Sequence, residues 1–370
     1  MRTQAKGLPI CVIGAGPAGA AAALALAARG FSRVTLLERC AWPRDKTCGG
    51  ALSLLALDWL ARARLLDEVA KWSTPISRYR LTLPPHGAVH RVTDKPICRI
   101  VRRAELDAFM VAEACRAGAT LVPESPVTAI RIAAGGVEIT TAKGELEAAA
   151  VIVATGALDS VKGAQLPPRQ SVATVMAHYA DLDLARDEIE MHYLAPLVPY
   201  YLWLFPEPNG DANVGITRPP SMTASLHALF DDALAGEIAP RFARATRTSR
   251  RCGAPIAFSE RVGQVVNGPV LIAGEAAGLV NSATGEGIYY ALASGALAGR
   301  MLAEALLGDG DASAGLATYQ TQVERSFGPM LAGAARLRQS LAAADLREVT
   351  DPLSLPYFRA LAAQGHAARA

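Results

Sequence analysis

The chain has 370 residues, of which 51% are hydrophobic, and a formal net charge of +3. This length exceeds the usual size of one domain, so we expect one large domain or two interleaved domains. The small net charge, with basic residues scattered except near residues 241–251, does not indicate a nucleic-acid-binding protein. The six cysteines form no C-x-x-C pair and the six histidines show no metal spacing, so no metal site is expected.

The first 28 residues imitate a secretion signal, because an apolar, alanine-rich run follows basic residues. A glycine motif inside that run explains it better, so we do not expect a cleaved signal. No segment reaches the roughly 18 uninterrupted apolar residues of a membrane span, and no transmembrane span is expected. We therefore expect a cytoplasmic protein with reduced thiols.

The segment 10–39 carries the strongest motif of the chain. Ile10–Ile13 reads as a short buried strand and leads directly into Gly14-x-Gly16-x-x-Gly19. Ala20–Ala28 has strong helix propensity, and a second apolar strand, Val34–Leu37, ends at Glu38. This strand, turn, helix and strand context makes the glycine pattern a specific sign of dinucleotide binding.

Each residue of this motif has a physical role toward a dinucleotide. Gly14 permits the tight turn, Gly16 lets the backbone approach a pyrophosphate, and Gly19 lets helix and strand pack closely. The N-terminus of the helix, which includes Ala18, offers free N–H groups and a positive dipole end to the phosphates. Glu38 is placed to accept hydrogen bonds from ribose hydroxyls.

The middle of the chain predicts further helices, short strands and one glycine-rich loop. The loop covers residues 39–50. We expect helices over Ser53–Arg62, Leu65–Lys71 and Arg103–Ala117, and strands over Arg78–Leu83, Val89–Val92, Pro96–Val101, Val127–Ile132, Gly136–Thr141 and Val151–Ala154.

The second half predicts another sheet and then a return to the nucleotide-binding unit. We expect strands near Ser171–Ala180, Glu188–Tyr193, Tyr200–Pro206, Ala212–Thr217 and Val270–Ala273, and helices over Ser221–Ala235, Gly285–Leu307 and residues 313–345. No second G-x-G-x-x-G occurs. If the one dinucleotide site holds FAD, the chain has no dedicated NAD(P) domain, and a reductant would have to reach the flavin transiently or come from a protein donor.

Four further motifs follow the first one. They are Lys46-x-Cys48-Gly49-Gly50, then Arg103-Ala104-Glu105-Leu106-Asp107, then Tyr201-x-Trp203-x-Phe205-Pro206, and last Gly274-Glu275-Ala276-Ala277-Gly278 with Thr284-Gly285-Glu286-Gly287-Ile288. With these motifs the chain resembles, over about Ile10 to Ala298, the geranylgeranyl reductase family of FAD-dependent oxidoreductases. That family lies within the wider class of aromatic-hydroxylase-like flavoproteins.

The chain departs from the family pattern at two places. Glu275 stands where the family usually has Asp, which keeps a carboxylate for a ribityl hydroxyl but lengthens the side chain. Thr155-Gly156 stands where many hydroxylase relatives have Asp-Gly. The second departure disfavours the hydroxylase interpretation and leaves the electron donor open between NAD(P)H and a protein.

The resemblance and the residue chemistry together predict the cofactor contacts. A guanidinium such as that of Arg103 pairs well with phosphate or ribose oxygens, and Arg39 is placed to stack on adenine. A helix that starts near Gly285, with Thr284 as its N-cap, would stabilise negative charge on a reduced flavin ring. The expected contacts are Gly14, Gly16, Ala18, Gly19, Glu38, Arg39, Lys46, Cys48, Gly49, Gly50, Arg103, Val127, Glu275, Gly285, Gly287 and Ile288, around FAD.

Cys48, Tyr201 and Trp203 are the candidate catalytic residues. The Cys48 thiol is placed to supply a proton to a carbon–carbon double bond that receives a hydride, or it is a small packing residue under the flavin. Tyr201, Trp203 and Phe205 share one face of a strand. They either form ordinary core or, as the resemblance implies, line an apolar tunnel for an isoprenoid chain on the same side of the flavin as Cys48.

The sequence thus predicts an α/β flavoprotein, with a Rossmann-type FAD-binding domain, an inserted β-sheet substrate domain and C-terminal helices. The predicted boundaries are residues 1–76, 102–169 and 262–310 for the FAD-binding domain, 77–101 and 170–261 for the substrate domain, and 311–370 for the helical segment. The expected reaction is reduction of C=C bonds in a prenyl or other hydrophobic substrate, with possible peripheral membrane contact.

Three other functions are weighed against this one. An FAD-dependent monooxygenase would hydroxylate an aromatic substrate, free or peptide-linked, on the same fold. A halogenase is disfavoured because its G-W-x-W-x-I-P run is not matched by Tyr201–Pro206. A nucleotide-binding regulatory protein would show no turnover at all.

Overall fold

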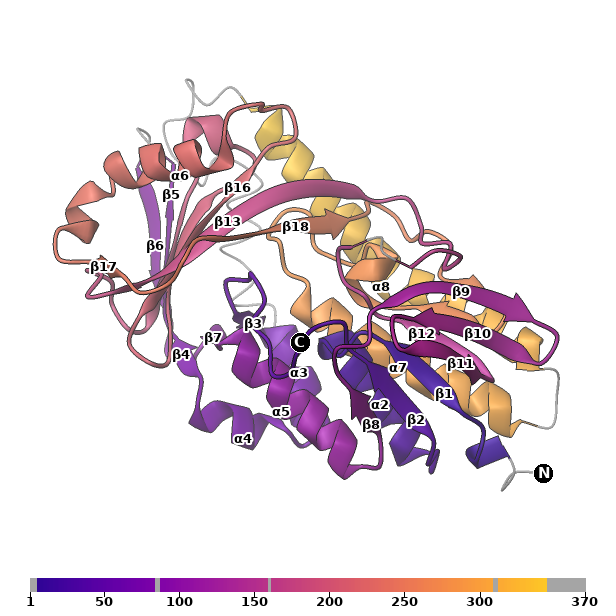
Figure 1. The fold of residues 1–370 in the computed structure, drawn as a ribbon. Coiled ribbons are helices and arrows are strands. Elements are labelled where there is room, and N and C mark those ends of the chain that lie inside the picture. The colour runs from indigo at the N-terminus through magenta and orange to yellow at the C-terminus, as the bar shows by residue number, and fades with distance from the viewer. Residues whose placement is uncertain (1–4, 84–86, 159–160, 309–311, 345–370) are drawn as a thin grey trace.

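The computed structural model describes residues 5–83, 87–158, 161–308 and 312–344 of the chain. Two large sheets lie side by side, and helices pack mainly around the first of them (Figure 1). None of the helices in the described ranges is both long and apolar enough to cross a membrane.

The first sheet has six strands in the order β19-β20-β12-β1-β2-β8. Its central strands pair in parallel and are buried on both faces, as their continuous apolar sequences predict. The strands are β1 (Ile10–Ile13), β2 (Val34–Leu37), β8 (Thr120–Val122), β12 (Ala150–Val153), β20 (Val270–Ile272) and the antiparallel edge strand β19 (Val266–Asn267). The predicted Rossmann-type unit is therefore confirmed.

Two helices pack closely over this sheet because small residues line their contact. The helices are α2 (Pro17–Ala28) and α7 (Ile288–Leu307). A Cβ added at Gly295 would lie 2.0 Å from the Ala18 carbonyl oxygen, and one at Gly299 would lie 2.3 Å from that of Ala22. Glycine is required at both positions for this approach, so the first turn of α2 is held firmly at the strand ends.

Further elements surround the first sheet. A three-stranded meander, β9 (Val127–Ala133), β10 (Gly136–Thr141) and β11 (Gly144–Ala148), shares its core, as do α3 (Leu54–Arg62), α4 (Leu66–Lys71) and α5 (Arg103–Arg116). A small sheet of β3 (Ala51–Ser53), β7 (Cys98–Ile100) and β4 (Thr74–Ile76) and the 3-10 turn η3 (Gly274–Ala277) complete this part.

The second sheet has eight strands and two different faces. One face packs on α6 (Leu226–Ala235), and the other faces the first sheet. Its strands are β5 (Arg78–Thr82), β6 (Ala88–Val92), β13 (Gln170–Ala180), β14 (Glu188–His192), β15 (Leu202–Pro206), β16 (Ala212–Arg218), β17 (Thr246–Arg247) and β18 (Cys252–Phe258). The short turns η1 (Ala195–Leu197) and η2 (Ala239–Phe242) connect them.

The long helix α8 (Ala312–Ala342) joins the two halves. Its side chains at Leu316 and Leu331 belong to the core of the first sheet, whereas Ala334 and Leu341 belong to that of the second. The remainder of the predicted C-terminal segment, residues 345–370, lies outside the described residues.

Several predicted boundaries were wrong. The helix α7 begins at Ile288 rather than Gly285, because Gly285 has a φ of +73° and the Asn281 side chain accepts the N–H groups of Ala283 and Thr284. Thr284 is therefore not its N-cap, a place that Gly287 takes. The helix α6 starts at Leu226 rather than Ser221, because the Ser225 side chain caps it. The strands β3, β4, β11, β17, β18 and β19 were not predicted.

Candidate active site

A cavity of about 880 Å³ lies between the two sheets. It is lined by the turn after β1, by the loop 39–50, by the inner face of the second sheet and by the loop that precedes α7. Elements far apart in sequence thus meet around one space, which is a common arrangement for cofactor and substrate sites.

Nearly all the predicted site residues line this cavity. They are Gly14, Gly16, Ala18, Glu38, Arg39, Lys46, Cys48, Gly49, Gly50, Arg103, Val127, Tyr201, Trp203, Phe205, Glu275, Gly285, Gly287 and Ile288. Gly19 does not line it. A Cβ there would lie 1.9 Å from the Gly14 carbonyl oxygen, so Gly19 serves the close packing of helix and strand that its spacing predicted.

The first turn of α2 presents uncapped N–H groups to the cavity. Gly16 is the N-cap residue and has no capping side chain, Pro17 follows it, and the first turn holds no acidic residue. A Cβ at Gly16 would meet only the Arg44 guanidinium, at 3.6 Å. A positive helix end that is open to the cavity suits a diphosphate group.

Glu38 is buried at the end of β2, and its carboxylate already has hydrogen-bond and ion-pair partners within the protein. Oε2 accepts the N–H of Ala15 at 3.1 Å, Oε1 accepts that of Cys40 at 3.1 Å, and Arg44 Nε lies 3.4 Å from Oε2. Oε1 has a second lone pair beyond the one that accepts the Cys40 N–H, so acceptor capacity remains for a ligand hydroxyl in the cavity.

A buried chain of charges runs from Glu38 along one wall of the cavity. Arg44 lies 2.9 Å from Asp107, and two nitrogens of Arg103 donate to the same carboxylate at 2.9 Å each. Asp107 is completely buried, and the two guanidinium groups compensate its charge. Burial lowers the pKa of Arg103, but Asp107 and the neighbouring Cys48 raise it by more. Arg103, predicted as a cofactor contact, keeps further N–H groups for the cavity.

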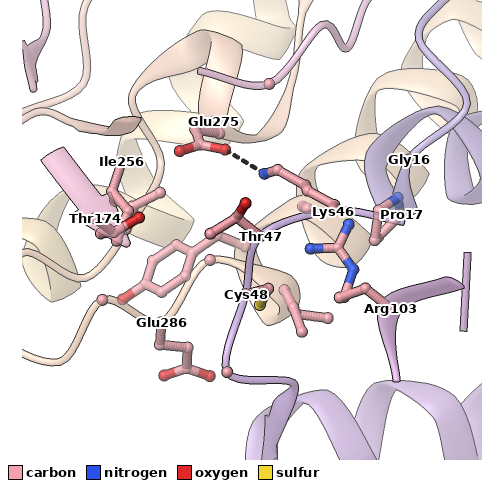
Figure 2. A pocket seen from close by; sticks show the side chains of 18 of the residues that line it. Gly16, Pro17, Lys46, Thr47, Cys48, Arg103, Thr174, Ile256, Glu275 and Glu286 are labelled. Atoms are coloured by element: carbon pink, nitrogen blue, oxygen red, sulfur yellow. Dashed lines mark hydrogen bonds and ion pairs between the residues drawn. The ribbon is translucent and has the colours of Figure 1, made fainter. Parts of the chain in front are cut away.

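Lys46 and Glu275 form an ion pair across the cavity. Lys46 Nζ lies 2.9 Å from Glu275 Oε2 (Figure 2). Glu275 Oε1 accepts the N–H of Ala257 at 3.0 Å. The longer side chain of Glu275 therefore reaches the loop 39–50 and the second sheet at once. Thr47 and Cys48 follow Lys46 along the same loop (Figure 2).

The backbone of Cys48 is held by the second sheet. Its N–H donates to Met176 Sδ at 3.3 Å, and its carbonyl accepts from Asn213 Nδ2 at 3.0 Å. Its sulfur accepts the N–H of Gly50 at 3.4 Å. Gly50 has a φ of +75°, and a Cβ there would lie 2.0 Å from the Val101 carbonyl oxygen, so only glycine fits.

The aromatic strand meets this loop directly. Trp203 and Phe205 are buried and line the cavity, whereas Leu202 and Leu204 point into the core under α6, as the alternation predicted. A Cβ at Gly49 would lie 2.9 Å from the Phe205 ring. Glycine at this position therefore allows the loop from the first half of the chain to touch the aromatic strand of the second sheet.

Two ionisable groups lie at the other end of the aromatic face. The Tyr201 hydroxyl donates to the Thr284 carbonyl, and burial raises its pKa far above the usual range. Glu286 lines the cavity and accepts from the Ser53 hydroxyl; burial raises the pKa of its carboxyl, which Ser53 partly offsets.

Sequence reasoning missed Asn213 and Met176 as participants in this site, and it quoted Asp107 and Glu286 within motifs without giving either a role. Asn213 had a detectable signal, since it is a polar amide among the apolar residues of the strand predicted over Ala212–Thr217. Met176 had none that separates it from an ordinary core residue, whereas Asp107 and Glu286 had their places in the motifs Arg103–Asp107 and Thr284–Ile288.

Comparison with known proteins identifies the family. Residues 8–187 match the model of the pyridine nucleotide-disulphide oxidoreductase family. The menaquinone reductase of Mycobacterium tuberculosis is 30% identical over 326 residues, which cover 79% of this chain and 76% of that protein. Digeranylgeranylglycerophospholipid reductase 2 of Methanopyrus kandleri is 27% identical over 338 residues, covering 86% and 83%. The chain belongs to the geranylgeranyl reductase family.

Solved structures confirm the fold of this family member. A geranylgeranyl bacteriochlorophyll reductase-like protein from Thermoplasma acidophilum superposes with a TM-score of 0.79 at 20% identity, covering 93% of this chain and 90% of that one. The flavin-dependent brominase Bmp2 superposes with a TM-score of 0.76 at 16% identity, covering 98% and 91%. These two likenesses concern the fold. The sequence relatives and the family model show that the chain is a flavin-dependent oxidoreductase, and the family resemblance seen in its motifs is confirmed.

Proposed function

We propose that this protein binds FAD and reduces carbon–carbon double bonds of a prenyl or similarly hydrophobic substrate. The observation that carries the proposal is the meeting of Cys48 with the Trp203–Phe205 face in one cavity. The names of the relatives support it, because they denote reductases of digeranylgeranylglycerophospholipid and of menaquinone.

The shape of the cavity supports FAD rather than a smaller flavin. The cavity extends from Glu38 and Val127, past the open N-terminus of α2, to Lys46 and Gly285. An adenosine near Glu38, a diphosphate at Gly16 and a flavin ring near Gly49 would use all of these features. The predicted cofactor residues that line the cavity, with Arg39 and Ile288 among them, are assigned to this ligand.

The wall formed by the second sheet supports a hydrophobic substrate. Trp203 and Phe205 lie on one face of β15, Tyr201 directly precedes this strand, and all three line the cavity. Leu81 and Met191 extend the same wall. An apolar chain would bury its surface there at about 25 cal/mol per Å². We propose that Tyr201 and Trp203 orient the substrate double bond beside Cys48, and that Phe205 binds the apolar chain of the substrate.

Reduction of a double bond needs a hydride on one carbon and a proton on the other. The bound flavin, when reduced, supplies the hydride. We assign the proton to the Cys48 thiol, whose sulfur becomes a thiolate as the new C–H bond forms. The Gly50 N–H at 3.4 Å and the neighbouring Arg103 guanidinium stabilise that negative charge. Tyr201 is a poorer acid, because burial raises its pKa and its proton is held by a carbonyl.

A direct assay tests this function. The purified protein is reduced anaerobically with dithionite and mixed with a geranylgeranyl lipid, and mass spectrometry follows the gain of one H2 per double bond. Reduced product with loss of the reduced-flavin spectrum is expected. Reaction of the reduced protein with oxygen to a long-lived flavin adduct, together with hydroxylation of an aromatic compound, would instead establish a monooxygenase. Repeating the assay with NADPH, NADH or a reduced ferredoxin identifies the donor.

A further inference from the structure

Asn213 on β16 connects two groups that come from different parts of the chain. Its Oδ1 accepts the indole N–H of Trp203 at 2.8 Å, and its Nδ2 donates to the Cys48 carbonyl at 3.0 Å. The side chain is 3% exposed. One buried amide thus joins the aromatic strand to the loop that carries the thiol.

The side-chain amide of Asn213 matches this pair of partners. The indole N–H can only donate, and a backbone carbonyl can only accept. A bridging side chain must therefore present one acceptor and one donor a short distance apart, and the identity of the partners also fixes which way the amide points. An ionised carboxylate would offer a second acceptor to the Cys48 carbonyl, and an aliphatic side chain would satisfy neither group.

The residues around Asn213 allow it to make both of these hydrogen bonds. Asn213 pairs with Phe205 across the β15–β16 ladder, and Trp203 pairs with Gly215. A Cβ at Gly215 would lie 2.2 Å from the Trp203 ring, so the glycine lets the indole lie flat over β16 and reach Asn213. Met176 Sδ, 3.4 Å from Nδ2, also accepts the Cys48 N–H. Both backbone polar groups of Cys48 therefore depend on this cluster.

We infer that Asn213 is a positioning residue that sets the Cys48 thiol and the Trp203 indole in a fixed relation on the cavity wall. It is not among the residues that line the cavity, and it acts through the two residues it joins. The inference rests on the proposed function for its catalytic consequence, whereas the position of Cys48 is measurable without any substrate.

Two substitutions test it. Asn213→Leu removes both hydrogen bonds at similar size. Asn213→Asp keeps an acceptor for Trp203, but the ionised carboxylate repels the Cys48 carbonyl. A protonated carboxyl again has one acceptor and one O–H donor, so it reproduces the amide. The Asp variant should therefore recover toward wild type as the pH falls, whereas the Leu variant should not.

The primary readout is the alkylation rate of Cys48 by iodoacetamide in the purified holoenzyme, followed by peptide mass spectrometry. Variant and wild type are compared at the same pH, and the result is given as the ratio of their rates. We expect the Leu variant to differ from wild type by about tenfold, the effect of one lost buried hydrogen bond. The Asp variant should differ similarly at pH 8 and approach wild type under acidic conditions.

Asn209→Asp is the matched control. Asn209 is exposed and only accepts, from the Asp211 N–H, so a carboxylate can replace its amide oxygen and no new pH dependence is expected. Near-ultraviolet circular dichroism checks that the variants fold. If the Leu variant does not fold, the pH response of the Asp variant decides the question by itself.

The outcomes separate this inference from the proposed function. Alkylation ratios within twofold of wild type in both Asn213 variants at every pH would overturn the inference, even if prenyl reduction occurs. Changed ratios with pH recovery in the Asp variant would support it, even if no prenyl substrate is reduced. Where wild type does reduce the lipid, kcat should follow the alkylation ratios while flavin content stays constant.

Discussion

Lys46 Nζ lies 2.9 Å from Glu275 Oε2, and this ion pair spans the cavity between the glycine-rich loop and the η3 turn. Because Glu275 also accepts the Ala257 N–H, one carboxylate joins three segments that are distant in sequence. A side chain one methylene shorter, as the family usually has here, would not make both contacts without movement of the backbone.

Glu275→Asp should loosen the loop 39–50. The shorter carboxylate can keep only one of its two contacts, so we expect a loss of about 1 kcal/mol in the free energy of unfolding and faster loss of flavin on dialysis. A double-mutant cycle with Lys46→Met measures the coupling by chemical denaturation. A coupling energy of zero would show that the pair contributes nothing to stability.

The bound cofactor should be FAD. The glycine motif, the open N-terminus of α2 and Glu38 together fit an adenine dinucleotide. Release by heat and chromatography against FAD, FMN and NAD standards identifies it. Recovery of FMN or NAD from carefully handled protein would contradict this expectation.

Glu38→Ala should weaken FAD binding while the fold survives. Hydrogen bonds to a charged acceptor are worth about 1.5–3 kcal/mol, which corresponds to about one to two decades in affinity. Titration of the flavin-free protein with FAD measures the change, and Glu105→Ala, at an exposed position on α5, is the control. Equal affinity in both variants would show that Glu38 does not contact the cofactor.

Cys48→Ser should slow reduction of the substrate double bond by about 100-fold or more, the usual effect of losing a general acid. A hydroxyl is nearly the same size as a thiol but a far weaker acid. Reoxidation of the reduced protein by an artificial acceptor needs no such proton and should be unchanged. Cys252→Ser, on β18 and outside the cavity, is the matched control. Full turnover in the Cys48 variant would make Cys48 a packing residue.

Glu286 should make the stability of the protein depend on pH. Burial raises the pKa of this carboxyl above its ordinary value of 4.5, so the folded state holds the proton more tightly than the unfolded state. The contribution of Glu286 to the free energy of unfolding is fully present below about pH 4.5 and is lost as the pH rises through the higher pKa of the folded state. The loss is about 1.4 kcal/mol for each unit by which the folded pKa exceeds the unfolded one. Glu286→Gln removes this titration. Urea unfolding at several pH values should show the Gln variant gaining on wild type as the pH rises, and parallel curves would refute the assignment.

Local patterns in the sequence determined the nucleotide-binding half. A buried strand, three glycines, an alanine-rich helix and Glu38 follow one another within 30 residues, so backbone sterics and short-range spacing specify the βαβ unit without help from distant segments. The alternation of Tyr201, Trp203 and Phe205 likewise placed them on one face, because side chains on a strand alternate with a period of two residues.

Only the tertiary structure decided which partners these residues meet. The Lys46–Glu275 pair joins residues separated by 229 positions, and the bond from Asn213 to the Cys48 carbonyl spans 165. Hydrogen bonds and ion pairs at such separations depend on how the two sheets pack, which no local periodicity encodes. The same packing determined that Glu38 and Arg103, predicted as ligand contacts, are also tied into a buried chain of charges through Arg44 and Asp107.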